Sequence, residues 1–152
     1  MSAARILVAC VGNVLRRDDG FGHAVAARLT NLPDGAKLLE TGIGGVALLQ
    51  ELLAGYDGLV LVDAVDHEAE PGTVLVIRPE VGEATHAPDV HLVNPERVLT
   101  MAKAMGALPE RVVIVGCQPV DASELGQQLS PSVERAVDVA AARVVEVVRD
   151  WL

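Results

Sequence analysis

The sequence predicts an α/β fold in which helices cover both faces of a mostly parallel sheet. Hydrophobic residues make up 51% of the 152 residues but aromatic residues only 2%, so the core must be aliphatic. Several short runs are aliphatic throughout, as in strands that are buried on both faces. They alternate with segments whose apolar residues repeat at helical spacing. The predicted order is β-α-β-α-β-β-α-β-α, and we expect one domain over residues 1–152.

The predicted strands are apolar runs bounded by polar or glycine-rich turns. They cover residues 5–11, 36–40, 59–62, 73–78 and 111–116. The connection between Asp63 and Thr73 is shorter than the dozen or so residues that a parallel crossover needs. We therefore expect the fourth strand to run antiparallel or to lie at an edge of the sheet.

Four helices are predicted between and after these strands. The first begins near Asp18, whose carboxylate is placed to cap it, and the second follows a glycine-rich loop at residues 41–45. The third opens at Asn94-Pro95 and stops at Gly106, and the fourth opens at Ser130-Pro131. The inward positions of the third helix are Val98, Leu99, Ala102 and Met105, and those of the fourth are Val133, Val137, Ala140, Val144, Val147 and Trp151.

Composition excludes several classes of protein. A net charge of -9 argues against a nucleic-acid binder, which would present a basic face. No run approaches the roughly 20 apolar residues that span a membrane. The apolar run near the amino end is too short for a signal peptide and fits a first strand better. A small acidic domain needs no partner to bury its core, so we expect a monomer.

The two cysteines, Cys10 and Cys117, lie far apart in apolar runs and match no metal-binding spacing. We interpret them as reduced thiols in the core, which favours the cytoplasm.

Polar side chains follow the predicted strands where an open α/β sheet binds its ligands. They are Asp18 and Asp19 after the first strand, Asp63 after the third, and His91 farther along. Carboxylates and an imidazole together suit zinc, nickel or iron, and three protein ligands leave positions open for a substrate. Each residue also has an ordinary explanation: a helix cap for Asp18, a solvated acid for Asp19, a turn former for Asp63 and a loop residue for His91.

Other candidates for chemistry are weaker. His23 lies one helical turn after Asp19 and is interpreted as structural, whereas His67 and His86 lie in polar loops. No serine lies in a G-x-S-x-G elbow, and nothing in the sequence marks Cys117 as an activated nucleophile. The sequence has no P-loop, and the single glycine after the first strand does not make a dinucleotide-binding fingerprint.

The run from Gly12 to Gly22, GNVLRRDDGFG, resembles the opening signature of the hydrogenase maturation endopeptidases. These enzymes process the large subunit of nickel-iron hydrogenases. The resemblance covers nearly the whole chain, in order. It continues through TGIGG at residues 41–45, VDA at 62–64, His91, VL at 98–99, VGCQP at 115–119 and LSPSV at 129–133.

This resemblance implies a three-layer α/β/α sandwich with a twisted five-stranded sheet. It also implies that two carboxylates and one histidine bind nickel and form the catalytic centre. Asp19 matches the first ligand, although some members have glutamate there, Asp63 matches the second, and His91 matches the third. His86 competes for the third role, but the spacing from His91 to residues 98–99 fits the family better.

The function implied is that of a cytoplasmic endopeptidase. It would remove a C-terminal extension from a hydrogenase large-subunit precursor after nickel insertion, with the nickel carried by that precursor. A magnesium-binding receiver domain is a second hypothesis. It fits less well, because the acids come six and seven residues after Gly12 and the fifth strand is not followed by the expected lysine. A metal chaperone without peptidase activity, with the same ligands, is a third.

Overall fold

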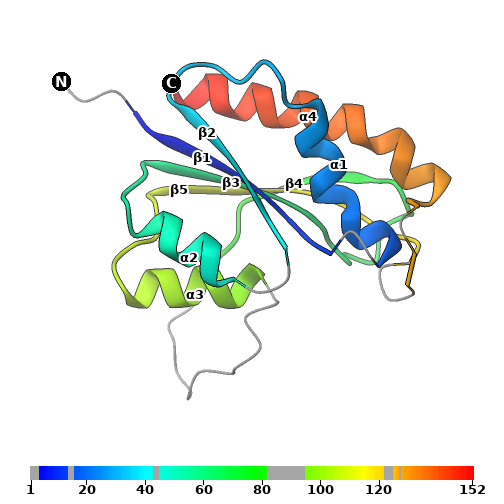
Figure 1. The fold of residues 1–152 in the computed structure, drawn as a ribbon, viewed down its shortest axis with the longest axis horizontal. Helices are drawn as coiled ribbons and strands as arrows, with labels where there is room; N and C mark the ends of the chain where they lie inside the picture. The colour runs from blue at the N-terminus through cyan, green and yellow to red at the C-terminus, as the bar shows by residue number, and fades with distance from the viewer. Residues whose placement is uncertain (1–3, 14–15, 43–44, 82–94, 122–124, 127) are drawn as a thin grey trace.

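A twisted five-stranded sheet is the middle layer of this computed structural model, which describes residues 4–13, 16–42, 45–81, 95–121, 125–126 and 128–152 (Figure 1). Its strands are β1 (Ile6–Val11), β2 (Ala36–Thr41), β3 (Gly58–Ala64), β4 (Val74–Ile77) and β5 (Arg111–Cys117). They lie in the order β2-β1-β3-β5-β4, and β4 alone is antiparallel to its neighbour. Both expectations for the fourth strand are confirmed, since β4 runs antiparallel and lies at an edge.

In the described residues, four α-helices cover the two faces of the sheet, which confirms the three-layer prediction (Figure 1). The helices α1 (Phe21–Arg28) and α4 (Pro131–Trp151) pack on one face, and α2 (Val46–Leu52) and α3 (Pro95–Ala104) on the other. A short 3-10 helix, η1 (Arg17–Gly20), leads into α1. None of the described helices is long and apolar enough to cross a membrane.

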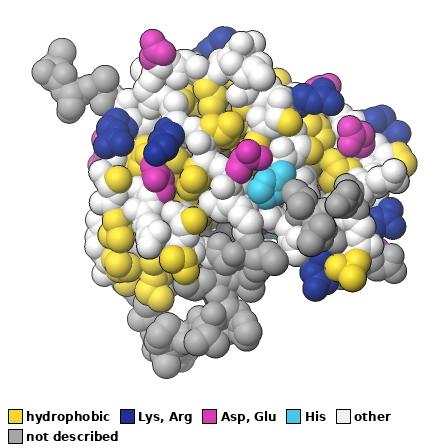
Figure 2. Space-filling model, viewed as in Figure 1, with side chains coloured by type: hydrophobic (Ala, Val, Ile, Leu, Met, Phe, Trp, Pro, Cys, Tyr) yellow, Lys and Arg dark blue, Asp and Glu magenta, His cyan; other side chains and the backbone are white. Residues whose placement is uncertain are grey.

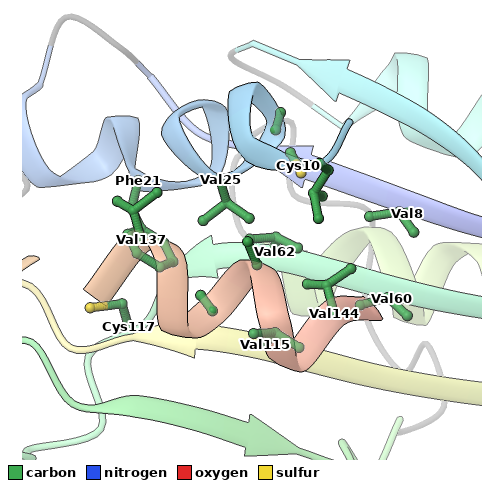
Figure 3. Packing of buried hydrophobic residues seen from close by; sticks show 14 of the residues in the cluster. Val8, Cys10, Phe21, Val25, Val60, Val62, Val115, Cys117, Val137 and Val144 are labelled. Carbon is green, nitrogen blue, oxygen red and sulfur yellow. The ribbon is translucent and has the colours of Figure 1, made fainter. Parts of the chain in front are cut away.

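The core is aliphatic, in agreement with the composition. Figure 3 shows side chains of α1 and α4 meeting those of β1, β3 and β5, with Phe21 and Val25 among them. Cys10 and Cys117 are buried there as free cysteines, as predicted. A second cluster lies on the opposite face, beneath α2 and α3.

Two details of the helices differ from prediction. The chain does not enter an α-helix at Asp18 but forms η1 first, and α1 starts at Phe21. Met105 does not point inward: its side chain is 49% exposed, because α3 ends at Ala104 and the chain turns through Gly106 at a φ of 71°. The predicted cap of this helix, Asn94, lies outside the described residues.

Parallel register brings four strand ends to one edge of the sheet. Cys10 pairs with Glu40 of β2 and with Val62 of β3, and Asp63 pairs with Gly116 of β5. The residues that follow β1 and β3 are therefore neighbours in space although they are about fifty positions apart in sequence.

Candidate active site

Two predicted site residues, Asp19 and Asp63, come together at this edge. Asp19 lies in η1, and Asp63 is the last residue but one of β3. Gly12 lies between them: a Cβ built on it would be 2.0 Å from the Asp19 carbonyl oxygen and 3.8 Å from Asp63 Oδ1. With a φ of 139° and no space for a side chain, this position requires glycine.

Within the part of the chain that the structure describes, Asp63 has little to compensate the burial of its carboxyl group. It is 8% exposed, and its Oδ1 accepts a hydrogen bond from the Ala64 N–H at 2.8 Å. Burial, together with the negative charge of Asp19, raises the pKa of the Asp63 carboxyl well above its ordinary value of 3.8. A cation beside the two carboxylates would offset both causes, so the pair fits a metal ion.

Asp19 is held by the turn that follows β1. The Asn13 N–H donates to Asp19 Oδ2 at 2.9 Å, and the Asp19 N–H donates to the Arg16 carbonyl oxygen at 3.1 Å. The start of α1 is seated close to the strands, because a Cβ on Gly22 would lie 2.3 Å from the Val11 carbonyl oxygen. The sheet thus sets where η1 and its carboxylates lie.

Asp18 does not cap α1, contrary to the sequence-based interpretation. It is fully buried, and neither η1 nor α1 has a side-chain cap. Its Oδ1 accepts from the Ser130 N–H at 2.6 Å, and its Oδ2 accepts from the Ser130 hydroxyl at 2.9 Å. Oδ2 also accepts from the N–H groups of Val120 at 2.8 Å and Asp121 at 2.9 Å. Asp18 therefore fastens η1 to the segment between β5 and α4.

These hydrogen bonds decide the charge of Asp18. Burial opposes ionisation, but the donors on Asp121, Ser130 and Val120 outweigh it and lower the pKa of the carboxyl below 3.8. Asp18 is thus a structural carboxylate, whereas Asp19, its neighbour in sequence, lies near enough to Asp63 for its charge to raise the pKa of that carboxyl.

His23 contacts the same turn from α1. Its Nε2 lies 3.0 Å from the Gly12 carbonyl oxygen and its Nδ1 lies 3.2 Å from Glu40 Oε1. Figure 2 shows a histidine beside an acidic side chain on the face that carries α1 and β2, where Lys and Arg side chains are scattered among acidic ones. The sequence predicts a structural role for His23 and identifies neither of these partners.

The predicted third ligand, His91, and its competitor, His86, both lie outside the described residues. Among the described residues no group of three or more His, Cys, Asp or Glu side chains is arranged to hold a metal ion. The described part of the site therefore consists of the pair Asp19 and Asp63.

Among the residues that the structure describes, the two buried thiols and the buried Ser130 hydroxyl are unsuited to act as nucleophiles. Burial, with the charge of Glu40, raises the pKa of the Cys10 thiol to about 12. Burial, with the charge of Asp18, raises that of Cys117 to about 11. The Ser130 hydroxyl donates to Asp18, and His67 is exposed in a loop. These states favour neither thiolate nor activated serine.

A groove of about 750 Å³ lies away from this site. Arg111, Val112 and Trp151 line it, so it lies where β5 begins, whereas Asp63 pairs with Gly116 near the opposite end of that strand. The groove is therefore separate from the carboxylate pair.

Comparisons with known proteins converge on one family. A model of hydrogenase maturation proteases matches residues 24–147. The hydrogenase expression/formation protein HupD of Rhizobium leguminosarum bv. viciae is 37% identical over 155 residues, which cover 98% of this chain and 76% of that protein. The hydrogenase 2 maturation protease of Escherichia coli (strain K12) is 32% identical, and the match covers 96% of this chain and 92% of that protein.

Solved structures agree with this result. The hydrogenase maturating endopeptidase HybD from E. coli has a TM-score of 0.80 at 31% identity, with 96% of this chain and 93% of that chain covered. The [NiFe] hydrogenase maturation protease HycI from Thermococcus kodakarensis KOD1 has a TM-score of 0.75 at 25% identity, with the same coverage of both chains.

Proposed function

This chain belongs to the hydrogenase maturation protease family and is an endopeptidase, and we propose that it cleaves the precursor of a nickel-iron hydrogenase large subunit. The bond cut releases a C-terminal extension, and cleavage follows the insertion of nickel into the precursor. The nickel belongs to the substrate, and the enzyme uses it as a recognition element. Family membership favours this function over a receiver domain or a metal chaperone without peptidase activity.

The observation that carries the proposal is the meeting of Asp19 and Asp63 at the carboxyl ends of β1 and β3. The two acids come from segments far apart in sequence, and Gly12 lets the backbone of Asp19 pack against the turn that follows β1, close to Asp63. Mutual repulsion is unfavourable unless a cation or a proton shares the site. With His91 as the third ligand, the set would have the oxygen and nitrogen donors that suit nickel.

In the proposed mechanism Asp19, Asp63 and His91 contact the nickel held by the precursor. Thiolates of the precursor keep the other positions on the ion. A precursor without nickel lacks this contact and binds too weakly to be cut. The same contact places the scissile carbonyl beside a Lewis acid, and a carboxylate beside the attacking water can accept its proton.

We further propose that the enzyme acts as a monomer in the cytoplasm, with the precursor as its partner and without binding nucleic acid or membranes. The net charge of -9 supports the exclusion of nucleic acid.

The direct test incubates the purified protein with nickel-loaded and with nickel-free precursor and weighs the products by mass spectrometry. We expect C-terminal truncation in the nickel-loaded sample only. Truncation of both samples would contradict recognition through nickel. Absence of truncation in both would contradict the proposed function, and transfer of nickel without truncation would favour a chaperone.

The histidine assignment needs its own variants. His91→Ala should abolish processing, whereas His86→Ala should retain it, with folding checked by circular dichroism. The reverse pattern would mean that His86 is the third ligand.

A further inference from the structure

We infer that His23 is a positioning residue for Asp19. Glu40, His23 and the peptide group that joins Gly12 to Asn13 form a chain of hydrogen bonds that ends on the Asp19 carboxylate. The inference itself rests on contacts in the structure. Only its kinetic test depends on the proposed function.

One peptide group transmits the effect of His23 to Asp19. The Gly12 carbonyl oxygen lies 3.0 Å from His23 Nε2, and the Asn13 N–H of the same peptide group donates to Asp19 Oδ2 at 2.9 Å. A peptide group is planar, so fixing its oxygen also fixes the direction of its N–H. His23 thus sets the direction from which the Asn13 N–H meets the Asp19 carboxylate.

The position of Gly12 makes this support necessary. Its φ of 139° lies in a region that few residues adopt, and its Cα is packed against the Asp19 carbonyl group. Glycine has no side chain with which to anchor itself. A donor from outside the turn, on α1, holds the carbonyl group in place.

Glu40 fixes the other side of the imidazole ring. Both ring nitrogens face oxygens, the Gly12 carbonyl and the Glu40 carboxylate, that act as acceptors. A carbonyl oxygen can only accept, so Nε2 is the donor to Gly12. Glu40 is at the end of β2, opposite Cys10 of β1, so the sheet positions it. The His23 side chain is 20% exposed and that of Glu40 is 52% exposed. The hydrogen bond from His23 to the Gly12 carbonyl oxygen is therefore less exposed to water than the contact with Glu40.

Polarisation adds to the geometric effect. A donor on a carbonyl oxygen strengthens the hydrogen bond made by the N–H of the same peptide group. The Asn13 N–H is therefore a better donor to Asp19 when His23 is present. Groups that bond directly to a metal ligand typically change metal affinity or activity by about 10- to 100-fold. His23 acts on such a group, the Asn13 N–H, from one hydrogen bond further out, so we expect an effect of about 10-fold.

The amide proton of Asn13 reports the effect directly in an NMR spectrum of the whole protein. We expect His23→Phe, which fills the space without a donor, to move this resonance upfield. His23→Gln, which retains an N–H donor, should return it toward the wild-type position. His67→Phe is the matched control in an exposed loop and should leave it unchanged, and thermal unfolding should show that every variant is folded.

Two outcomes would overturn the inference. One is an Asn13 resonance that does not move in folded His23→Phe. The other is a His23→Gln spectrum that departs from wild type as far as His23→Phe does, because packing rather than hydrogen bonding would then explain the role of His23.

The kinetic test uses the nickel-loaded precursor. His23→Phe should lower kcat/KM by about 10-fold, and His23→Gln should recover most of the loss. Unaltered kcat/KM in His23→Phe would contradict positioning of Asp19. If the wild-type protein processes no precursor, the proposed function fails, while the Asn13 resonance still decides the role of His23.

Discussion

Asp18 and Asp63 are both buried aspartates at the carboxyl edge of the sheet, but their surroundings have opposite effects on their charge. Asp18 accepts hydrogen bonds from three residues of the segment before α4, and its pKa is lowered. Asp63 accepts a hydrogen bond from its own neighbour Ala64 and lies near the charge of Asp19, and its pKa is raised. The carboxylate of Asp18 therefore stabilises the fold, whereas a charged carboxylate at Asp63 destabilises it.

Asp63→Asn should produce the largest effect and should separate function from stability. We expect processing of the precursor to fall by about 1,000-fold or more, because the carboxylate that we propose contacts the nickel is lost. The free energy of unfolding at neutral pH should rise, because the neutral amide removes a buried charge and its repulsion by Asp19. Urea unfolding and mass spectrometry measure the two quantities.

A urea midpoint lower than that of the wild-type protein for Asp63→Asn would contradict the conclusion that the Asp63 carboxylate destabilises the fold. Asp138→Asn is a suitable control, because Asp138 pairs with Arg28 on the exposed surface and should affect neither quantity appreciably.

Asp18→Asn should do the opposite and destabilise the protein by about 3 kcal/mol, since hydrogen bonds to a charged group are lost and an amide NH₂ meets N–H donors. Urea unfolding measures this loss. A change as small as that of Asp138→Asn would mean that the segment before α4 is held by other contacts.

Gly22→Ala tests how much the close approach of α1 to the sheet contributes to the stability of the fold around Asp18 and Asp63. The new Cβ would lie 2.3 Å from the Val11 carbonyl oxygen and 2.8 Å from that of Val62, so α1 must shift. We expect a loss of about 2 kcal/mol in the free energy of unfolding. Gly42→Ala is the control, because a Cβ there would have no atom within 4 Å.

The smallest expected effect is on the dependence of stability on pH. The contribution of Asp18 is fully present above the ordinary pKa of 3.8 and is lost as the pH falls through its lowered pKa. Asp63 changes the stability in the opposite direction. Between its ordinary pKa of 3.8 and its raised pKa in the folded state, the free energy of unfolding increases as the pH falls, because the folded state binds the proton more tightly than the unfolded state.

Urea unfolding of Asp63→Asn and Asp18→Asn at several pH values separates the contributions of the two aspartates to stability. Asp63→Asn should remove the rise in stability on mild acidification, and Asp18→Asn should flatten the fall below about pH 4. Curves that parallel wild type in both variants would contradict the assigned charges.

Much of the fold was predictable because its signals are local. The aliphatic runs locate the strands, and the short connection after Asp63 accounts for the antiparallel edge strand β4. Asp19 and Asp63 could be paired because parallel strands end at one edge of the sheet, although their assignment as nickel ligands rests on resemblance. His91 lies outside the described residues, so its place in the site stays a prediction.

The roles of Asp18 and His23 were not predictable, because their partners are distant in sequence. A carboxylate before an apolar helix has the local appearance of a cap, and only the tertiary structure brings Val120, Asp121 and Ser130 to it. Likewise, His23 has an ordinary helical position, and its contact with Glu40 depends on the register of β2 against β1. Met105 was misplaced because the helix ends one residue before it.

The attachment of Asp18 also determines when the site can be completed during synthesis. The N–H groups that it accepts from belong to residues 102 to 112 positions later in the chain. A ribosome makes the amino end first, so the turn that carries Asp19 emerges well before the segment that fastens it. Until that last part of the protein has emerged, the acidic turn that carries Asp19 lacks the hydrogen bonds that anchor it.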